Sequence, residues 1–473
     1  MAVFNFLKTA FLAGWRERHG RPEHFARIAS SKLERLLNHA RQNVPLQMER
    51  LATVTEFAQI RPIAKLEMMT RFAESLAVNS VTGDEVMCVA GNEQPGSKWI
   101  RDRYLVTKTS GSTGERGIFV TDLATWESQR ATIFSRISRG LSPWRRLRGL
   151  LRGERFRMAH LVGDCPFCVT RQSALDSQHK ARRLCETRLL SIMDPLEKSI
   201  QALNEFQPHF LYLYPSVLVA IAKRRQQTGQ INFAPNALIV GCEMLTESDR
   251  HVITEAFPGS RLVNQYGASE CPALAVSCPA GQLHVNLEHA LIEPVDADNQ
   301  PVAVGELSDK ILLTNLDNFV QPFIRYEISD RVRLIDKPCP CGSPLPVIEV
   351  HGRADDTIHL LDSKGQVREI LPLTILTSLF GLAELNFHQV AHVRQNVIEL
   401  RIHPTPGVPF EAAAVAGRSA LSRALRVFGV DSSVTVQVTA LDSIPRQSHA
   451  GKFKSVVSEV PPPNKSAGSR RSA

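Results

Sequence analysis

The sequence predicts an α/β fold built from two domains: a large N-terminal domain over residues 1–352 and a small α+β domain over residues 353–460. Between residues 200 and 345, helical and strand-like segments alternate, which is typical of helices packed on a mostly parallel sheet. After Asp355, strands and helices still alternate but the segments are shorter, which predicts a hinge near this residue. A chain of 473 residues also exceeds the size at which single cores stop growing, about 250–300 residues.

Helices are expected first along the chain. Residues 1–15 are mostly apolar but contain Lys8 and lack a small-residue cleavage site, so an amphipathic helix fits them better than a secretion signal. From residue 22 to about residue 60, apolar side chains recur at helical spacing, and Pro45 closes this segment. Strands are predicted at residues 104–106 and 118–120, on either side of a polar loop.

Beyond residue 200 the predicted elements are short. Residues 216–225 have helical character, and apolar segments predict strands at residues 237–240, 261–263, 311–314 and 332–335. In the second domain, Ser363-Lys364-Gly365 predicts a hairpin turn. From Pro461 onward, three prolines and a run of Ser, Gly, Arg and Lys predict a disordered tail over residues 461–473.

Composition and charge are those of a globular protein that can bind polyanions. The chain is 43% hydrophobic and 22% charged, with a formal net charge of +9 at pH 7. A basic balance suits an enzyme that uses ATP and CoA, and it equally suits a nucleic-acid or membrane-surface binder. Eight arginines between residues 136 and 157 are expected to lie on a solvated surface; a patch for phosphates or an anionic membrane is the less favoured interpretation. No recognisable nucleic-acid-binding fold accompanies them, so no nucleic-acid partner is expected.

Two protein classes are excluded by the sequence pattern. No apolar run reaches the length of about 18 residues that a membrane-spanning helix needs. Nine cysteines in a chain of this length do not form the pattern of a secreted disulfide framework. We therefore expect the protein to work in a reducing cytoplasm.

The most informative local motif is Thr109-Ser110-Gly111-Ser112-Thr113-Gly114. Its two glycines allow a tight turn that presents backbone N–H groups, and its four hydroxyls add donors, so the loop can wrap a triphosphate. No Gly-Lys-Ser/Thr follows, which excludes a nucleotide-binding loop of the Walker kind. A flexible Ser/Gly turn is the alternative, and the position between two predicted strands favours the phosphate-binding interpretation.

Further motifs follow the loop in order along the chain: Gln265-Tyr266-Gly267-Ala268-Ser269-Glu270, Ile324-Arg325-Tyr326-Glu327-Ile328-Ser329-Asp330, Gly352-Arg353-Ala354-Asp355-Asp356 and Gly451-Lys452. Together they resemble the adenylate-forming superfamily of acyl-CoA synthetases and peptide-synthetase adenylation domains. The branch that looks closest contains the phenylacetate–CoA ligases and the deazaflavin-adenylating synthetases, to which residues 36–45 are also similar. The resemblance covers nearly the whole chain and implies a large adenylate-forming domain followed by a small mobile domain.

This resemblance implies a set of ATP-binding residues. The β- and γ-phosphates would be held by Ser110, Gly111, Ser112, Thr113 and Gly114. The adenine would lie against Gly241, Glu243, Tyr266 and Gly267, with the tyrosine ring stacked on the base. The ribose hydroxyls would bind Asp330, since a carboxylate accepts two O–H hydrogen bonds well, and Arg353 would reach the ribose or a phosphate from the edge of the hinge.

Three residues are implied in catalysis. Ser269 would hydrogen-bond the α-phosphate or the substrate carboxylate. Glu270 would hold Mg²⁺, which offsets charge repulsion when a carboxylate attacks the α-phosphate. Lys452 would stabilise the charge that gathers on the phosphorus and the leaving pyrophosphate, and the family places this lysine on the small domain. Seen singly, a residue such as Tyr266 is more often a core aromatic and one such as Asp330 a helix or turn cap, so only the joint occurrence of the motifs supports the assigned roles.

The sequence departs from the family pattern at two places. Residues 447–450 separate Pro445-Arg446 from Gly451-Lys452, and this longer spacing leaves Lys454 as a substitute for the catalytic lysine. After the phosphate loop, Arg116-Gly117 replaces the commoner Pro followed by Lys or Thr. The contact with pyrophosphate is therefore expected to differ.

A metal site is a separate hypothesis. Cys339-Pro340-Cys341-Gly342 is a tight turn with two thiols, and Cys278 and His284 precede it by some sixty residues. Three thiolates and an imidazole would complete a tetrahedral structural zinc site, as the resemblance to phenylacetate–CoA ligases also implies. Four unlinked residues are the alternative interpretation.

The expected activity is that of an acid–CoA ligase. A carboxylic acid, aryl or arylalkanoic by resemblance alone, would react with MgATP to give an acyl-AMP, and CoA would then accept the acyl group. One alternative is an enzyme that passes AMP or the acyl group to an alcohol or a carrier protein. Another is a degenerate nucleotide-binding module, against which the presence of Glu270, Asp330, Arg353 and Lys452 argues.

Overall fold

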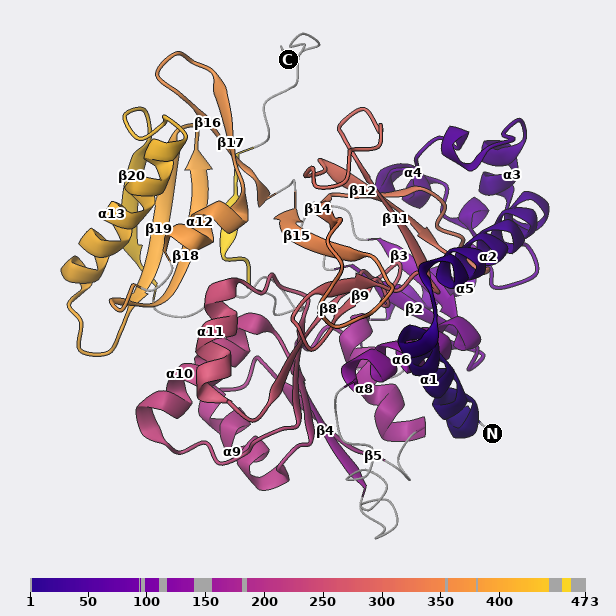
Figure 1. The fold of residues 1–473 in the computed structure, drawn as a ribbon, viewed down its shortest axis with the longest axis horizontal. Helices are drawn as coiled ribbons and strands as arrows, with labels where there is room; N and C mark the ends of the chain where they lie inside the picture. The colour runs from indigo at the N-terminus through magenta and orange to yellow at the C-terminus, as the bar shows by residue number, and fades with distance from the viewer. Residues whose placement is uncertain are drawn as a thin grey trace. The chain divides into compact units, whose positions relative to one another are not determined.

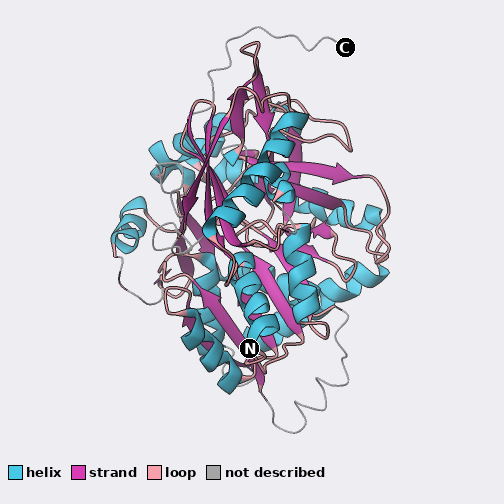
Figure 2. Cartoon of the chain, turned by 90° about the vertical axis from the view of Figure 1, so that its left-hand side faces the viewer, coloured by secondary structure: helices cyan, strands magenta, loops and turns pink. Residues whose placement is uncertain are grey.

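The computed structural model describes residues 2–92, 94, 98–109, 117–139, 155–180, 185–353, 356–379, 382–441 and 453–460. The described chain up to Val350 forms one compact unit, and the described residues from His351 onward form a second (Figure 1). Each unit is an assembly of helices and strands, as Figure 2 shows by colour. None of the described helices combines the length and the apolar character needed to cross a bilayer.

The first unit begins with helices α1 (Ala2–His19), α2 (Pro22–Asn43), α3 (Pro45–Leu51), α4 (Lys65–Thr70) and α5 (Gly83–Gly91), with 3₁₀ turns at Phe57–Gln59 and Ala73–Ser75. The predicted helix over residues 22–60 is therefore divided. Pro45 starts α3, because a proline fits the first turn of a helix, where its missing N–H has no partner to lose. Helix α5 begins at a capping box in which Thr82 and Glu85 bind each other's backbone amides.

A nine-stranded sheet organises the first unit, with the strand order β14-β15-β10-β9-β8-β7-β6-β4-β5. The strands are β4 (Phe156–Val162), β5 (Cys185–Ser191), β6 (Phe210–Leu213), β7 (Ala237–Gly241), β8 (Arg261–Tyr266), β9 (Ala275–Ser277), β10 (Leu283–Val285), β14 (Asp330–Ile335) and β15 (Val347–Arg353). Strands β5, β4, β6, β7 and β8 pair in parallel, whereas β9 and β10 join antiparallel.

Helices cover both faces of this sheet. They are α6 (Leu123–Ile137), α8 (Val169–Lys180), α9 (Leu196–Phe206), α10 (Pro215–Thr228) and α11 (Glu247–Ala256). Figure 1 shows α9, α10 and α11 on one face and α6 and α8 on the other. Because the central strands are apolar on both faces, the main core cluster includes Leu161, Leu211, Leu238 and Val263, all of them buried. The predicted α/β class and the strands predicted near residues 237 and 261 are confirmed.

Two three-stranded sheets complete the first unit. One has the order β1 (Trp99–Ile100), β2 (Tyr104–Lys108) and β3 (Ile118–Asp122), and the other β11 (Ala290–Val295), β12 (Lys310–Asn315) and β13 (Tyr326–Ile328). Strands β2 and β3 pair antiparallel, so the two strands predicted on either side of the phosphate loop are confirmed.

The second unit is an α+β structure. Strands β16 (Ile358–Leu361) and β17 (Val367–Ile370) form a hairpin whose turn contains Gly365 at φ 74°, where a glycine is favoured. A four-stranded sheet has the order β20 (Thr435–Ala440), β19 (Val397–Pro404), β18 (Leu385–Arg394) and β21 (Val456–Ser458). Helices α12 (Pro372–Ser378) and α13 (Phe410–Val427) accompany it. The predicted hairpin at residues 363–365 is confirmed.

Candidate active site

The ends of the parallel strands β7 and β8 form the first part of the candidate site. Gly241 ends β7 and lies beside Gln265 of β8. A Cβ atom at Gly241 would lie 2.8 Å from the Gln265 carbonyl oxygen and 2.8 Å from the Tyr212 hydroxyl. A Cβ at Gly267 would collide with the Pro272 carbonyl. Both predicted glycines are therefore required by close backbone approach, at the strand edge where open α/β sheets bind ligands.

Tyr266 and Asp330 meet although 64 residues separate them. The Tyr266 hydroxyl donates a hydrogen bond of 2.6 Å to Asp330 Oδ2. Tyr266 ends β8 and Asp330 begins β14, so two separate strands bring these predicted residues to one place. The phenol orients the carboxylate, and carboxylate oxygens can accept hydrogen bonds from a diol.

Glu270 is a buried carboxyl, 8% exposed, in the loop after β8. Burial raises its pKa above the ordinary value, and Asp330 raises it further, whereas a hydrogen bond from Tyr326 and the charge of Lys65 lower it. Its backbone carbonyl accepts a 2.8 Å hydrogen bond from Asn315 Nδ2. A nearby cation would strongly stabilise the charged form of a carboxyl in this position. The preceding residue, Ser269, is half-buried.

The residues predicted to hold the phosphates, Ser110 to Gly114, lie outside the described residues, but both ends of their loop are described. Thr109 N donates to the Gly117 carbonyl at 2.9 Å, and Gly117 N donates to Thr109 Oγ1 at 2.8 Å. These two bonds extend the β2–β3 pairing to the base of the loop. A side chain at Gly117 would clash with the Phe119 ring, so the glycine allows this closure.

Glu243 has a structural contact in addition to its predicted place beside the adenine. Its carboxylate accepts a 3.1 Å hydrogen bond from Ser216 N, in the first turn of α10. A negative charge is favoured there because the first amides of a helix lack intrahelical partners. Glu243 therefore ties the loop after β7 to the start of α10.

Behind these strand ends lies a buried aromatic pair. The rings of His160 on β4 and Tyr212 on β6 are stacked with centroids 5.8 Å apart. Burial, together with the charge of Arg130, lowers the pKa of His160 to about 3, so its imidazole is neutral. Neither ring nitrogen has a hydrogen-bond partner among the described residues.

The four predicted metal ligands converge. One ligand atom from each of Cys278, His284, Cys339 and Cys341 lies within 4.8 Å of all the others. The Sγ atoms of Cys278 and Cys339 are 3.6 Å apart, and Cys341 Sγ lies 3.4 Å from His284 Nε2.

The environment of the cluster suits a metal ion. His284 Nδ1 is 2.9 Å from the Leu345 carbonyl oxygen, which fixes this nitrogen as the donor and leaves Nε2 for a metal. Burial lowers the pKa of His284, which keeps the imidazole neutral. Burial and the neighbouring thiols raise the pKa of Cys339 to about 12. Three thiols and one imidazole at these distances match the donors that a structural Zn²⁺ prefers.

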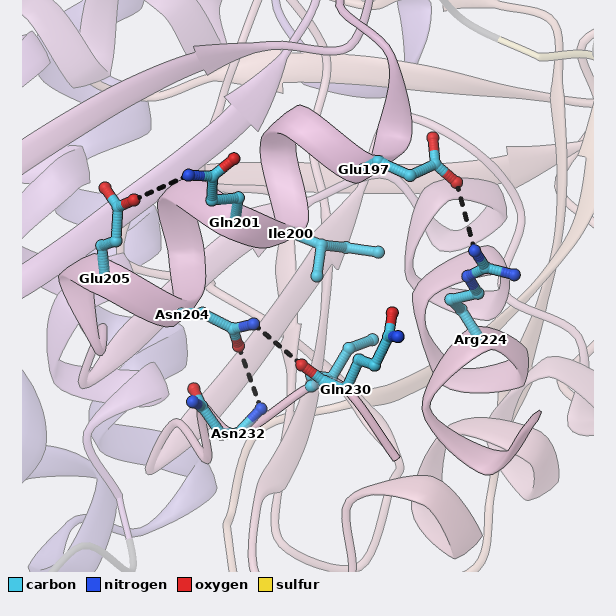
Figure 3. Close-up of a pocket in the computed structure, with 9 residues that line it drawn as sticks. Glu197, Ile200, Gln201, Asn204, Glu205, Arg224, Gln230 and Asn232 are labelled. Atoms are coloured by element: carbon cyan, nitrogen blue, oxygen red, sulfur yellow. Dashed lines mark hydrogen bonds and ion pairs between the residues drawn. The ribbon is translucent and has the colours of Figure 1, made fainter. Parts of the chain in front are cut away.

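A pocket of about 340 Å³ lies elsewhere, between α9, α10 and the segment before β7 (Figure 3). Asn204 Nδ2 donates to the Gln230 carbonyl and Asn204 Oδ1 accepts from Asn232 N, each at 2.9 Å. Glu197 and Arg224 pair across it at 3.8 Å. None of the residues that line this pocket is a predicted site residue, and their polar groups bind one another.

No family model matches the chain, but individual proteins are similar to it in sequence and in structure. Phenylacetate–coenzyme A ligase of Pseudomonas putida is 25% identical over 389 residues, which cover 78% of this chain and 79% of that protein. The corresponding enzyme of Aromatoleum evansii is 25% identical over 263 residues, covering 54% and 55%. The crystal structure of 2-hydroxyisobutyryl-CoA ligase with 2-HIB-AMP, in its postadenylation state, matches with a TM-score of 0.71 at 18% identity, covering 94% of this chain and 91% of that one.

These similarities are consistent with the adenylate-forming superfamily that the sequence motifs resemble. The predicted fold class, a large α/β part with a smaller C-terminal part, is confirmed by the same comparison. Within this adenylate-forming fold, Gly241, Tyr266, Gly267, Glu270 and Asp330 lie around the ends of β7 and β8 and the start of β14.

Two predicted residues belong to the chain beyond Val350. Arg353 ends β15 and is half-buried in the second unit. Lys452 lies outside the described residues. Lys454, the alternative to Lys452, is described: its Nζ donates to Asp356 Oδ1 at 2.7 Å, in an ion pair within the second unit.

Lys65 is a site residue that the sequence analysis missed. It begins α4, and its Nζ donates a 3.2 Å hydrogen bond to Thr109 Oγ1 at the base of the phosphate loop. Its Cε would lie 3.0 Å from a Cβ at Gly117, and its charge lowers the pKa of Glu270. The only signal in the sequence was the departure from the family pattern after the loop, where no lysine follows, because it indicates that a cation would come from elsewhere in the chain.

Proposed function

We propose that the protein activates a carboxylic acid with ATP as its acyl-AMP and then transfers the acyl group to CoA. The observation that carries this proposal is the group formed by Lys65, Glu270 and the Tyr266–Asp330 pair beside the base of a Ser/Gly-rich loop. The curated relatives are phenylacetate–coenzyme A ligases, which supports an aryl or arylalkanoic acid as the substrate.

The first half-reaction joins the acid to the nucleotide. A carboxylate oxygen of the substrate attacks the α-phosphorus, the bond from this phosphorus to the bridging oxygen breaks, and pyrophosphate leaves with that oxygen. Negative charge grows on the transferred and leaving groups, so fixed cations in a water-poor site lower the barrier. Lys65 supplies one such charge at the base of the loop, and we assign the second to Lys452.

Glu270 fits the role of a Mg²⁺ ligand. The carboxyl is buried, Lys65 and Asp330 both act on its charge, and burial raises its pKa. Bound Mg²⁺ would neutralise phosphate charge during the attack. Ser269, beside it, would hydrogen-bond the α-phosphate or the substrate carboxylate.

The nucleoside would lie along the strand ends. Asp330, oriented by the Tyr266 hydroxyl, would accept hydrogen bonds from the ribose. The adenine would lie against Gly241, Glu243, Tyr266 and Gly267, at the strand ends where other parts of the chain pack closely on the two glycines. Ser110, Gly111, Ser112, Thr113 and Gly114 would hold the β- and γ-phosphates, and Arg353 would reach the ribose or a phosphate.

The second half-reaction transfers the acyl group. The CoA sulfur attacks the acyl carbonyl carbon, the carbon–oxygen bond to phosphate breaks, the thiol loses its proton, and AMP leaves. The matching 2-hydroxyisobutyryl-CoA ligase was crystallised with CoA as well as its acyl-AMP, which supports CoA as the acceptor.

We also propose one structural Zn²⁺ per chain, held by Cys278, His284, Cys339 and Cys341. The ion would join the β9–β10 pair to the segment between β14 and β15.

The cysteine pattern, with no secreted disulfide framework, supports placement in a reducing cytoplasm.

A pyrophosphate-exchange screen tests the activity. Purified protein, MgATP and labelled pyrophosphate are incubated with a panel of aromatic, arylalkanoic and fatty acids, and acid-dependent label in ATP is measured. We expect exchange with at least one aryl or arylalkanoic acid, followed by thioester and AMP once CoA is added. Exchange that never leads to CoA consumption would indicate transfer to another acceptor, and no exchange with any acid would contradict the proposal.

A further inference from the structure

Helix α1 is attached to the rest of its unit along one side. Ala10, Ala13 and Glu17 are buried on that side, between 2% and 7% exposed. The ring of Phe6 lies 5.9 Å from the ring of Phe134 on α6. Arg136 of α6 donates to the Ala13 carbonyl at 2.8 Å and pairs with Glu17 at 3.0 Å. These contacts fix the orientation of α1 and so decide which of its side chains face solvent.

Another side of α1 presents four large apolar side chains to solvent. Phe4 is 70% exposed, Leu7 46%, Phe11 65% and Trp15 48%. At about 100° per residue, these positions fall within about 80° of arc, centred about 130° from the side formed by Ala10, Ala13 and Glu17. Other exposed large apolar side chains in the described chain, such as Val427 on α13, are spread over different elements. We call these four residues the α1 stripe.

The exposed charged side chains of α1 are positive. Lys8 and Arg18 are exposed on α1, and the exposed ring of His19 lies tilted against the ring of Trp15 with centroids 5.4 Å apart. The only acidic residue of α1 is Glu17, which is buried and paired with Arg136 and Arg139. The solvent side of the helix therefore combines aromatic and aliphatic side chains with cations and has no carboxylate.

We propose that the α1 stripe docks the protein on the surface of an anionic lipid bilayer. A helix that lies in a membrane interface needs an apolar face that enters the headgroup region and cations that meet anionic lipids. Three of the four stripe residues are aromatic, and aromatic rings are favoured at this depth. The lysine and arginine stems can extend toward the headgroups while the rings enter the bilayer. This docking is independent of the proposed adenylation chemistry.

Vesicle flotation of the full-length protein tests the docking. The protein is mixed with phosphatidylcholine vesicles that contain about one third phosphatidylglycerol, and with pure phosphatidylcholine vesicles. We expect the protein to float with the anionic vesicles, with less binding to the neutral ones and at high salt. Phe4→Ser with Phe11→Ser should lower the bound fraction at least about tenfold, since each side chain contributes buried apolar area. Lys8→Glu with Arg18→Glu should lower it on anionic vesicles.

Fluorescence and a matched control complete the test. Emission of Trp15 should shift to shorter wavelength on binding, and Trp15→Phe should remove that shift. Val427→Ser, which removes an 83% exposed apolar side chain from another helix, should bind vesicles like the unchanged protein. Pyrophosphate exchange in solution should be the same for all these variants, so a failure here is distinct from a failure of the proposed activity.

Two results would overturn the docking. One is wild-type protein that floats with neither vesicle type. The other is a dimer in light scattering that Phe4→Ser with Phe11→Ser converts to a monomer without any vesicle binding. The second result would make the α1 stripe a contact between two copies of the chain.

Discussion

At the scale of single residues, the buried carboxyl of Glu270 offers a direct test of the proposed metal role. Glu270→Gln removes the charge and keeps the shape, so pyrophosphate exchange should fall about 10²-fold or more. Glu306→Gln, at an exposed carboxylate whose Oε2 accepts from Ala303 N, should leave exchange unchanged. Near-normal exchange in a well-folded Glu270→Gln protein would remove this residue from the site.

The same substitution has an expected effect on stability. Because the pKa of Glu270 is raised in the folded protein, its contribution to stability is present at acid pH and is lost as the pH rises through the folded pKa. Without Mg²⁺, Glu270→Gln should therefore melt at a higher temperature than wild type at neutral pH. The difference should shrink in acid, where both side chains are neutral. Melting curves at several pH values, with and without Mg²⁺, measure it.

Lys65 gives a second test at this scale. Lys65→Met keeps the chain length and removes the charge at the base of the phosphate loop, so exchange should fall by about 10- to 100-fold. The KM for MgATP should rise, because the charge also acts on bound phosphates. Lys65→Arg should recover part of both losses. Equal activity of the Met and wild-type proteins, at equal melting temperature, would show that Lys65 only supports Thr109.

At the scale of elements, the proposed Zn²⁺ would hold the β9–β10 pair to the turn at residues 339–342. Purified protein prepared without chelator should contain roughly one zinc per chain. Cys339→Ser with Cys341→Ser should lose the zinc and lower the melting temperature, while adenylation persists in part. Cys88→Ser, at an exposed cysteine of α5, should keep both the zinc and the stability. Absence of zinc from the wild-type protein ends the hypothesis.

The cluster also connects to the helices around it. Arg139 donates to the Cys341 carbonyl at 2.6 Å and pairs with Glu17 of α1, which also accepts from Ser343 Oγ. Loss of zinc is therefore expected to raise proteolysis near α1 as well as near the turn, because buried charges would lose their anchored partners.

At the scale of the whole molecule, Lys452 tests the division of work between the two domains. It lies about a hundred residues beyond Val350, on the predicted small domain. If its charge serves only the departure of pyrophosphate, Lys452→Ala should lower exchange by about 10²–10³-fold. The same variant, given prepared acyl-AMP and CoA, should still form much of the wild-type thioester. Lys454→Ala should spare both steps, because its ammonium already pairs with Asp356. Equal loss of both half-reactions in Lys452→Ala would refute this division.

Local pattern was enough to predict much of the molecule. Apolar runs bounded by turn residues predicted β7, β8, β12 and β14, because buried strands are short and apolar whatever surrounds them. The order of motifs along the chain indicated the superfamily and named Tyr266, Glu270 and Asp330. The spacing of thiols and imidazole predicted a four-residue group, and the structure brings its ligand atoms within 4.8 Å of one another. These features depend on residues close in sequence, or on motifs that act together.

Contacts between distant segments were decided only by the tertiary structure. Lys65 contacts Thr109 from a helix that begins 44 residues earlier, and Tyr266 of β8 contacts Asp330 of β14, 64 positions later in the chain. No local spacing in the sequence could therefore reveal either pair. The exposure of Phe4, Leu7, Phe11 and Trp15 depends on which side of α1 meets α6. The sequence specifies which residues are apolar, which are charged and which could bind a metal. Which of them touch depends on how strands and helices far apart in the chain pack, and that packing is settled by the fold as a whole.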